Sequence, residues 1–210
     1  MDIQFYGANC IVLSGKKARV VVDDNLAALG AQSVAKEGDI NLFTSEAHAK
    51  TLKHSKIMID RPGEYEVSGV SVYGIAARAH MDEEKQKTAV MYKLTFEDLN
   101  ILVTGHIYPE LSDAQLESIG MIDILFVPVG GNGYTLDGIG ALKLIKKIGP
   151  KMVVPTHYDD SRLHFEVPQQ PLDQALKALA MEPKETVNKL RVKSADLLDA
   201  TTQLVVLQNF

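Results

Sequence analysis

The sequence predicts an α/β fold built on a large mixed sheet or a pair of sheets. Its first half consists mainly of short β-branched and aromatic runs separated by turn residues, a pattern typical of strands. Its second half alternates buried strand-like runs with amphipathic helical segments, which is typical of parallel strand pairing. No linker-like stretch interrupts the 210 residues, so we expect one domain over residues 1–210.

Seven strands and one edge strand are expected in the first half. Gly15 can supply the positive φ of a hairpin-type connection, and Asp98 and Asn100 tolerate one. The segment 62–69 (PGEYEVSG) sets an alternating Glu-Tyr-Glu-Val run between turn residues, which predicts a turn leading into an edge strand. The seven other strands are expected at Ile3–Tyr6, Ile11–Leu13, Arg19–Val22, Ile40–Phe43, Val70–Ile75, Ala89–Phe96 and Ile101–Val103.

Three helices are expected in the second half. The first, 112–120, begins with Ser112 as an N-cap and has Gln115 three residues later, as in a capping box. The second, 136–150, places its apolar side chains on one face and two lysines opposite, near its C-terminal end. The third, 171–180, is also amphipathic.

Two apolar runs, 122–129 (IDILFVPV) and 151–156 (KMVVPT), flank the second helix. This strand–helix–strand order predicts that the two strands pair in parallel. A last apolar run, 203–210 (QLVVLQNF), predicts a strand that either completes a sheet edge or contacts a second subunit. The sequence does not determine the oligomeric state.

Composition argues against several classes of partner. The formal charge of −5 arises from 22 basic and 27 acidic residues spread along the chain, so we expect neither nucleic acid nor an anionic membrane as a partner. No 18 apolar residues run together, and the first ten residues resemble a strand rather than a signal peptide. Cys10 is the only cysteine, which suits a reducing compartment. We therefore expect a cytoplasmic protein.

Titratable residues follow several of the apolar strands, where α/β proteins usually build their sites. His80, His106 and His157 each come directly after such a strand. Three neutral imidazoles from separate strand ends can hold one zinc ion and leave a position open. For any one of them taken alone, a loop histidine bonded to backbone or solvent is the more common case. The glycine-rich segment 128–138 (PVGGNGYTLDG) is either a loop that needs positive φ or, less favoured, a cradle for an anion.

The order and spacing of seven segments resemble the metallo-β-lactamase superfamily, over about residues 1–160. The resemblance is greatest to the branch that contains L-ascorbate-6-phosphate lactonase and zinc-dependent hydrolases of β-lactamase fold. It implies an αββα sandwich with a metal centre at one edge, built from loops at strand ends. The matching segments are IQFYGANCIVL, ARVVVDD, INLFTSEAH, PGEYEVSGVSVYGIAARAH, NILVTGH, IDILFVPVGG and PKMVVPTHY.

The main metal motif of that family, Thr-His-x-His-x-Asp-His, is lost in this sequence. The aligned stretch is residues 44–50, TSEAHAK, in which His48 falls on a spacer position. The early Gly-His of the family is Gly7-Ala8 here. A two-metal centre that activates a bridging hydroxide cannot be built from what is left. The four ligand positions of the motif hold Ser45, Ala47, Ala49 and Lys50.

Other positions of the family pattern are kept or replaced. The resemblance matches His80 and His157 to metal-binding histidines, and it places His106 where the family has a bridging aspartate. Asp23 matches an aspartate that lies behind the metal loop in relatives. In a metal-free pocket, Lys50 would supply the missing positive charge and pair with Asp23 or Glu46.

Two functions therefore stay open. The first is a metal-free binding or scaffold protein that keeps the fold and a small-molecule pocket lined by six residues. The second is a hydrolase of a small phosphorylated or lactone-like metabolite that uses a single zinc ion on His80, His106 and His157. The six pocket residues are Asp23, Ser45, Lys50, His80, His106 and His157.

Overall fold

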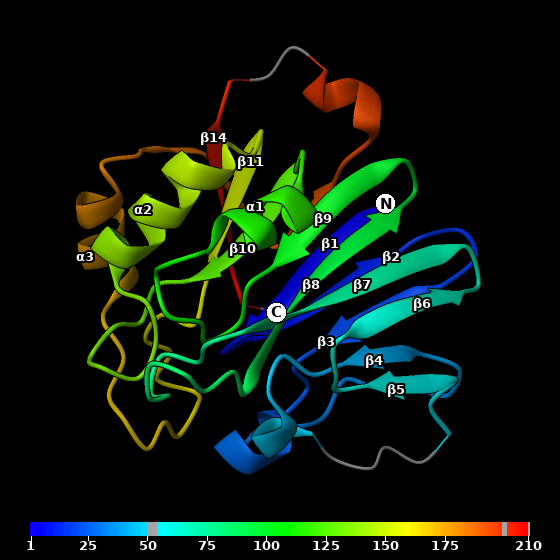
Figure 1. Cartoon of the computed structure of the whole chain (residues 1–210), viewed down its shortest axis with the longest axis horizontal. Helices are drawn as coiled ribbons and strands as arrows, with labels where there is room; N and C mark the ends of the chain where they lie inside the picture. The colour runs from blue at the N-terminus through cyan, green and yellow to red at the C-terminus, as the bar shows by residue number, and fades with distance from the viewer. Residues whose placement is uncertain (50–53, 199–200, 210) are drawn as a thin grey trace.

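The protein consists of two β-sheets that pack face to face, seen in a computed structural model that describes residues 1–49, 54–198 and 201–209 (Figure 1). The smaller sheet has six strands and the larger has eight. In order across the smaller sheet, the strands are β13 (Lys189–Arg191), β1 (Asp2–Gly7), β2 (Cys10–Ser14), β3 (Arg19–Val22), β4 (Ile40–Leu42) and β5 (Ile57–Ile59). Across the larger sheet they are β12 (Pro183–Val187), β14 (Gln203–Leu207), β11 (Met152–Thr156), β10 (Ile124–Pro128), β9 (Leu99–Val103), β8 (Ala89–Phe96), β7 (Val70–Ala77) and β6 (Gly63–Val67).

The main core lies between the two sheets. Strand β1 shows why: buried and partly exposed residues alternate along it, so Ile3 and Phe5 face inward. They pack with buried residues of the larger sheet such as Val72, Tyr92 and Ile101. Burial of apolar side chains from both sheets holds the sandwich together.

Three α-helices cover the outer face of the larger sheet (Figure 1). They are α1 (Asp113–Ile119), α2 (Gly138–Ile148) and α3 (Leu172–Leu179). Helix α1 begins at the predicted Ser112 capping box, whose hydroxyl accepts from the Gln115 N–H at 3.3 Å. The predicted parallel pairing also holds, because β10 and β11 lie in parallel register on either side of α2 along the chain.

The outer face of the smaller sheet is covered differently. Strands β3 and β4 are parallel, so the chain must cross over between them. In the crossover, η1 (Leu26–Leu29) is a single 3₁₀ turn, and the rest is irregular chain. Leu26 and the partly buried Val34 pack on Cys10 and Val21 of the sheet. The fourth layer of the predicted αββα sandwich is therefore thin here, although the two-sheet sandwich itself is confirmed.

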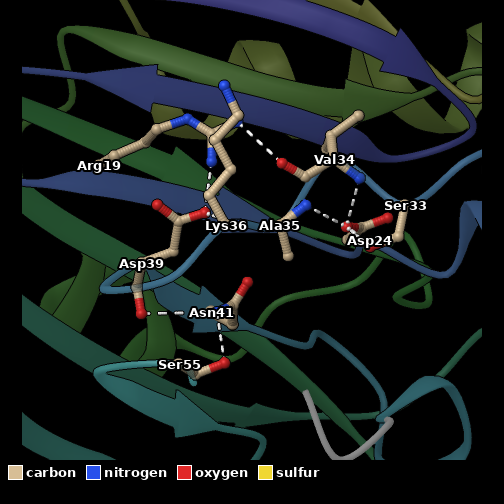
Figure 2. A network of polar contacts seen from close by, with 9 residues as sticks. All are labelled: Arg19, Asp24, Ser33, Val34, Ala35, Lys36, Asp39, Asn41 and Ser55. Atoms are coloured by element: carbon tan, nitrogen blue, oxygen red, sulfur yellow. Dashed lines mark hydrogen bonds and ion pairs between the residues drawn. The ribbon is translucent and has the colours of Figure 1, made fainter. Parts of the chain in front are cut away.

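Two buried carboxylates hold this crossover on the sheet (Figure 2). Asp24 Oδ2 accepts from the Ser33 hydroxyl at 2.6 Å and from the backbone N–H groups of Val34 and Ala35 at 2.8 and 2.7 Å. Asp39 forms an ion pair with the Arg19 guanidinium, which also donates to the Val34 carbonyl at 3.0 Å. Because irregular chain cannot satisfy its own N–H groups, these carboxylates do so in place of a helix.

The predicted strands are present, and three short ones were missed. Strand β6 is an edge strand of the larger sheet, as predicted. Strands β5 and β13 have three residues each, and β12 begins with a proline and is exposed at four of its five positions, so none shows a strand pattern. The expectation that 203–210 completes a sheet edge is corrected, because β14 pairs with β11 on one side and β12 on the other. Its alternative, contact with a second subunit, stays a prediction.

Along the described chain, no helix has both the length and the apolar character needed to cross a membrane. The longest, α2, has 11 residues and carries Lys146 and Lys147 in its last turn.

The Asp24 contacts give a stability prediction. We expect Asp24→Ala to lower the free energy of unfolding by about 3 kcal/mol, because a hydroxyl and two N–H groups lose their acceptor in a buried setting. Urea unfolding measures the change. The matched control is Asp173→Ala, which removes an exposed carboxylate whose ion pair with Lys177 is 3.8 Å long; we expect less than about 0.5 kcal/mol. Equal effects of the two substitutions would show that the crossover does not depend on Asp24.

Candidate functional site

The ends of β7, β9 and β11, every second strand in this part of the larger sheet, bring the three predicted histidines to one edge of the sandwich. His106 follows β9 and His157 follows β11, and their ring centroids lie 4.5 Å apart with the rings at 84°. His80 follows β7, and its backbone N–H donates to the His106 carbonyl at 2.7 Å. The structure thus places His106 and His157 in direct ring contact, with His80 on the adjacent loop.

The tautomer of His157 follows from its hydrogen bonds. Its Nδ1 lies 3.1 Å from Gln169 Oε1. The Gln169 Nε2 donates to the Val167 carbonyl at 2.5 Å, so Oε1 must accept and Nδ1 of His157 carries the proton. The neutral ring then has its acceptor lone pair on Nε2. The backbone N–H of His157 donates to the Ala8 carbonyl at 2.7 Å, which fixes the residue at a left-handed φ of 54°.

Tyr134 lies against both imidazoles. Its ring centroid is 4.9 Å from that of His106 and 5.9 Å from that of His157. Burial raises the pKa of the Tyr134 phenol, and the charges of Glu166 and Asp23 raise it further, so the phenol stays protonated. A protein side chain therefore occupies the space beside the two histidines.

The glycine-rich loop after β10 carries Tyr134 to this place. The Gly131 N–H donates to the Leu136 carbonyl at 2.9 Å, and the Tyr134 N–H donates to the Gly131 carbonyl at 3.2 Å. A Cβ on Gly130 would lie 2.2 Å from the His157 carbonyl oxygen, so this close approach requires glycine. Since the loop uses these N–H groups internally, the glycines serve its conformation, and an anion cradle is not favoured.

His80 lines a separate cavity of about 310 Å³ next to the N-terminus of α2. Burial lowers the pKa of its imidazole, while a backbone hydrogen bond at Ile107 and the charge of Asp137 act in the opposite direction. Asp137 and Lys143 also line this cavity, so it holds one charge of each sign. It offers no net charge for an ionic ligand.

Asp23 supports the loop after β4 from behind. It is 1% exposed, and its two carboxylate oxygens accept from the Thr44 N–H at 2.7 Å and the Thr44 hydroxyl at 2.6 Å. A Cβ on Gly105 would lie 2.4 Å from Thr44 Oγ1, so the end of β9 packs directly on Thr44. These contacts set the position of the chain that precedes His106.

The loop itself presents few groups that could bind a metal. Ser45 forms an isolated β-bridge with Ala89. The exposed Glu46 pairs with the Arg61 guanidinium at 3.6 Å, and Ala47 lines an open cavity beside this pair. Lys50 and the side chain of His48 lie outside the described residues, so the prediction that Lys50 pairs with a carboxylate stays a prediction.

Metal-binding side chains do not gather at one point among the residues that the structure describes. Within residues 1–49, 54–198 and 201–209, no three His, Cys, Asp or Glu side chains are placed so that they could hold a metal ion. The structure brings His106 and His157 together but does not set His80 with them as a third ligand. The edge-on rings and the glutamine on Nδ1 of His157 form a packed aromatic cluster instead.

A second cavity, of about 290 Å³, was not predicted from the sequence. It is distinct from the His80 cavity and is lined by residues from four segments. The segment 164–169 has no periodic pattern and no strand before it, so only its aromatic and acidic residues could have drawn attention. The lining includes Asn25, Tyr134, His157, Phe165, Glu166 and Gln169.

Comparison with known proteins points to one family. Residues 2–157 match the family model described as a beta-lactamase superfamily domain. A protein from Carboxydothermus hydrogenoformans named UPF0173 metal-dependent hydrolase is 46% identical over 44 residues. This match spans 21% of the present chain and 19% of that protein.

Solved structures share the fold over nearly the whole chain. A proposed Zn-dependent hydrolase of the metallo-beta-lactamase superfamily from Thermotoga maritima is 24% identical, with a TM-score of 0.76, and the match covers 99% of this chain and 100% of that one. A proposed metal-dependent hydrolase from Parabacteroides distasonis is 17% identical, with a TM-score of 0.64 and coverage of 98% and 93%. At such identities these likenesses establish the fold alone. The narrower resemblance to L-ascorbate-6-phosphate lactonase stays a prediction.

The Gln169 contact predicts the tautomer of His157. We expect ¹⁵N NMR of the imidazoles to show the proton on Nδ1 of His157 at pH 8, above the ordinary imidazole pKa of about 6.5. Gln169→Leu removes the acceptor and should shift the population toward the Nε2–H form. Gln170→Leu is the neighbouring control and should leave the spectrum of His157 unchanged. An Nε2–H tautomer in the unmodified protein would contradict the assignment.

The lowered pKa of His80 predicts a pH dependence of stability. Below about pH 6.5 the unfolded chain binds a proton at His80 before the folded chain does. The free energy of unfolding should therefore fall as the pH drops from there, until the pH passes the lower folded-state pKa. Urea unfolding at several pH values measures the free energies of unfolding of the parent and of His80→Gln. The difference between the two free energies should become smaller as the pH falls. If NMR gave a folded-state pKa of His80 above 6.5, the free energy of unfolding would rise rather than fall toward acid, and the prediction would be wrong.

Proposed function

Because the chain belongs to the beta-lactamase superfamily, we propose that it is a small-molecule binding protein that uses this fold without a two-metal centre. The observation that carries the proposal is the packing of His106, His157 and Tyr134 against one another, with ring centroids 4.5 to 5.9 Å apart. In this role we expect the two imidazoles and the phenol to act together as walls of a pocket. The binding region comprises the His80 cavity and the second cavity, which Tyr134 and His157 line.

The loop after β4 supports this proposal from its chemistry. Alanine side chains carry no lone pair, and a serine hydroxyl is a poor ligand for a divalent ion. Glu46, which stands on a spacer position of the lost motif, pairs with Arg61. Without a metal-bound hydroxide, the protein lacks the nucleophile that would hydrolyse a substrate in this fold.

Relatives named metal-dependent hydrolases make a bound metal plausible as the alternative. A single zinc ion on three histidines would supply an activated water. This alternative needs His80 to approach His106 and His157 as a third ligand, and the side chains described here are not so placed. We infer further that the protein works in the cytoplasm, since its one cysteine, Cys10, is buried and unpaired.

Metal content and hydrolysis test the proposal together. We expect protein purified without chelator and without a metal-affinity tag to contain far less than one zinc per chain by elemental analysis. We also expect no hydrolysis of phosphodiester, lactone or β-lactam substrates with zinc or manganese added. The blank is the triple variant His80→Ala, His106→Ala and His157→Ala. One zinc per chain together with activity that the triple variant lacks would establish the single-metal hydrolase and remove the binding-protein proposal.

A restored loop provides the positive control. The variant Ser45→His, Ala47→His, Ala49→Asp and Lys50→His rebuilds the family motif after Thr44. We expect this variant to bind zinc more tightly than the parent, because it returns four ligands to a loop that Asp23 still supports. Isothermal titration with zinc measures both proteins. Comparable zinc affinity of the parent and the variant would mean that the parent already has a metal site.

A further inference from the structure

The cavity on the Glu166 side of Tyr134 has a composition that selects one class of ligand. Four segments far apart in the sequence form it: Asn25 before η1, Tyr134 from the glycine-rich loop, His157 after β11, and the stretch 164–169. We call it the Glu166 cavity. Its volume of about 290 Å³ is at the lower end of the range for small-molecule sites, so it suits a small ligand.

The charge on its walls has one sign. Among the described residues that line it, Glu166 carries a carboxylate and none is a lysine or arginine. The buried Asp23 adds to the same field, since Asp23 and Glu166 both raise the pKa of the Tyr134 phenol. His157 and His164 complete the titratable residues of its lining.

Aromatic rings form part of the remaining walls, together with the aliphatic side chains of Ala28, Leu29 and Val167. The centroid of Phe165 lies 5.2 Å from that of His157, and Tyr134 lies 5.9 Å from the same ring. The faces of phenylalanine and tyrosine attract a cation through their quadrupole, and the attraction grows when the cation is desolvated. Glu166 and Gln169 add oxygen acceptors, although Gln169 Oε1 already accepts from His157.

We propose that the Glu166 cavity binds a small organic cation of the ammonium class, held by the carboxylate of Glu166 and the rings of Tyr134 and Phe165. An anion would meet a carboxylate without a fixed positive charge in return, and its desolvation would go uncompensated. An uncharged molecule of the same shape would gain the contact area but lose the attraction to the carboxylate and the ring faces. This inference rests on the proposed function, because a metal-free cavity beside His157 is its premise.

Matched probes test the class of ligand. Choline and n-butylammonium are the cations, 3,3-dimethylbutan-1-ol is the uncharged isostere of choline, and butyrate is the anion. Titrations of the full chain at pH 8, followed by NMR at His157 and Tyr134, should show binding of both cations. Binding of the isostere should be weaker by about tenfold, the loss expected when the cation's attraction to rings and carboxylate is removed. Binding of the isostere or of butyrate as tightly as choline, or no binding of either cation, would overturn the proposal.

Three variants locate the site. Glu166→Gln keeps the shape of the side chain and removes its charge, so it should weaken choline binding by about tenfold while leaving the binding of the uncharged isostere unchanged. Phe165→Leu keeps an apolar wall and removes the ring, and it should also weaken choline more than the isostere. Glu117→Gln on α1 is the control with an exposed carboxylate removed elsewhere, and it should change nothing. Equal choline binding by Glu166→Gln and the parent would also overturn the proposal.

Two sources of the cation can be separated. A short peptide that carries one trimethyllysine presents the same group as choline on a protein chain. Tighter binding of the peptide than of choline would assign the ligand to a protein partner, and weaker binding would assign it to a free metabolite. Failure here is also distinct from failure of the proposed function. If the uncharged isostere binds as tightly as choline, the protein is still a binding protein, but the proposed cationic ligand is wrong. If the protein holds one zinc per chain and hydrolyses a substrate, the proposed binding function is wrong, whatever the probes show.

Discussion

The position of Thr44 governs the edge of the sandwich at which the histidines meet. Its N–H and hydroxyl both donate to the buried carboxylate of Asp23 at the end of β3, in the smaller sheet. Its carbonyl accepts from the Val90 N–H of β8, in the larger sheet, at 2.8 Å. Its side chain fills the space where a Cβ on Gly105 would be, just before His106. One residue thus joins both sheets and determines how close the strand ends come.

This support consists of hydrogen bonds and packing between protein groups alone. The loop after β4 can therefore keep its starting point while the side chains beyond Thr44 change. By the predicted alignment, Ser45, Ala47 and Ala49 stand where the family motif has ligands, and the contact of Asp23 with Thr44 is complete. The position of His157 after β11 is likewise set by a protein group, because the Gln169 contact orients its ring. The edge is preorganised by the fold, and its chemistry depends on residues that the fold does not require.

Sequence reasoning predicted those parts of the molecule in which apolar residues recur at a regular spacing. Alternation and β-branched runs predicted the inner strands, and a capping box predicted the start of α1 at Ser112. The rule that polar residues gather at strand ends placed His106 and His157 near each other, as their ring contact shows. The orientation of the rings was beyond reach, because it depends on Tyr134, which comes from an irregular loop. Short or exposed strands such as β12 carry too few buried side chains to leave a pattern.

The Glu166 cavity could not be predicted from the sequence for a related reason. Its lining residues come from segments separated by more than a hundred positions, from Asn25 to Gln169, and none belongs to a common motif. The resemblance ended near residue 160, just before the stretch that supplies Phe165 and Glu166. Contacts between such distant segments follow only from the three-dimensional path of the chain.

The strand order also bears on synthesis at the ribosome. Strand β14 enters the larger sheet between β11 and β12, β13 covers the outer side of β1, and Phe5 forms a β-bridge with Asn209. Strand β1 thus pairs with a strand, β13, that is translated almost two hundred residues later. While the nascent chain grows, β1 and β11 each keep an unpaired edge, the kind of surface on which chaperones act and chains aggregate. The larger sheet therefore cannot be completed before the apolar strand at 203–207 has been translated.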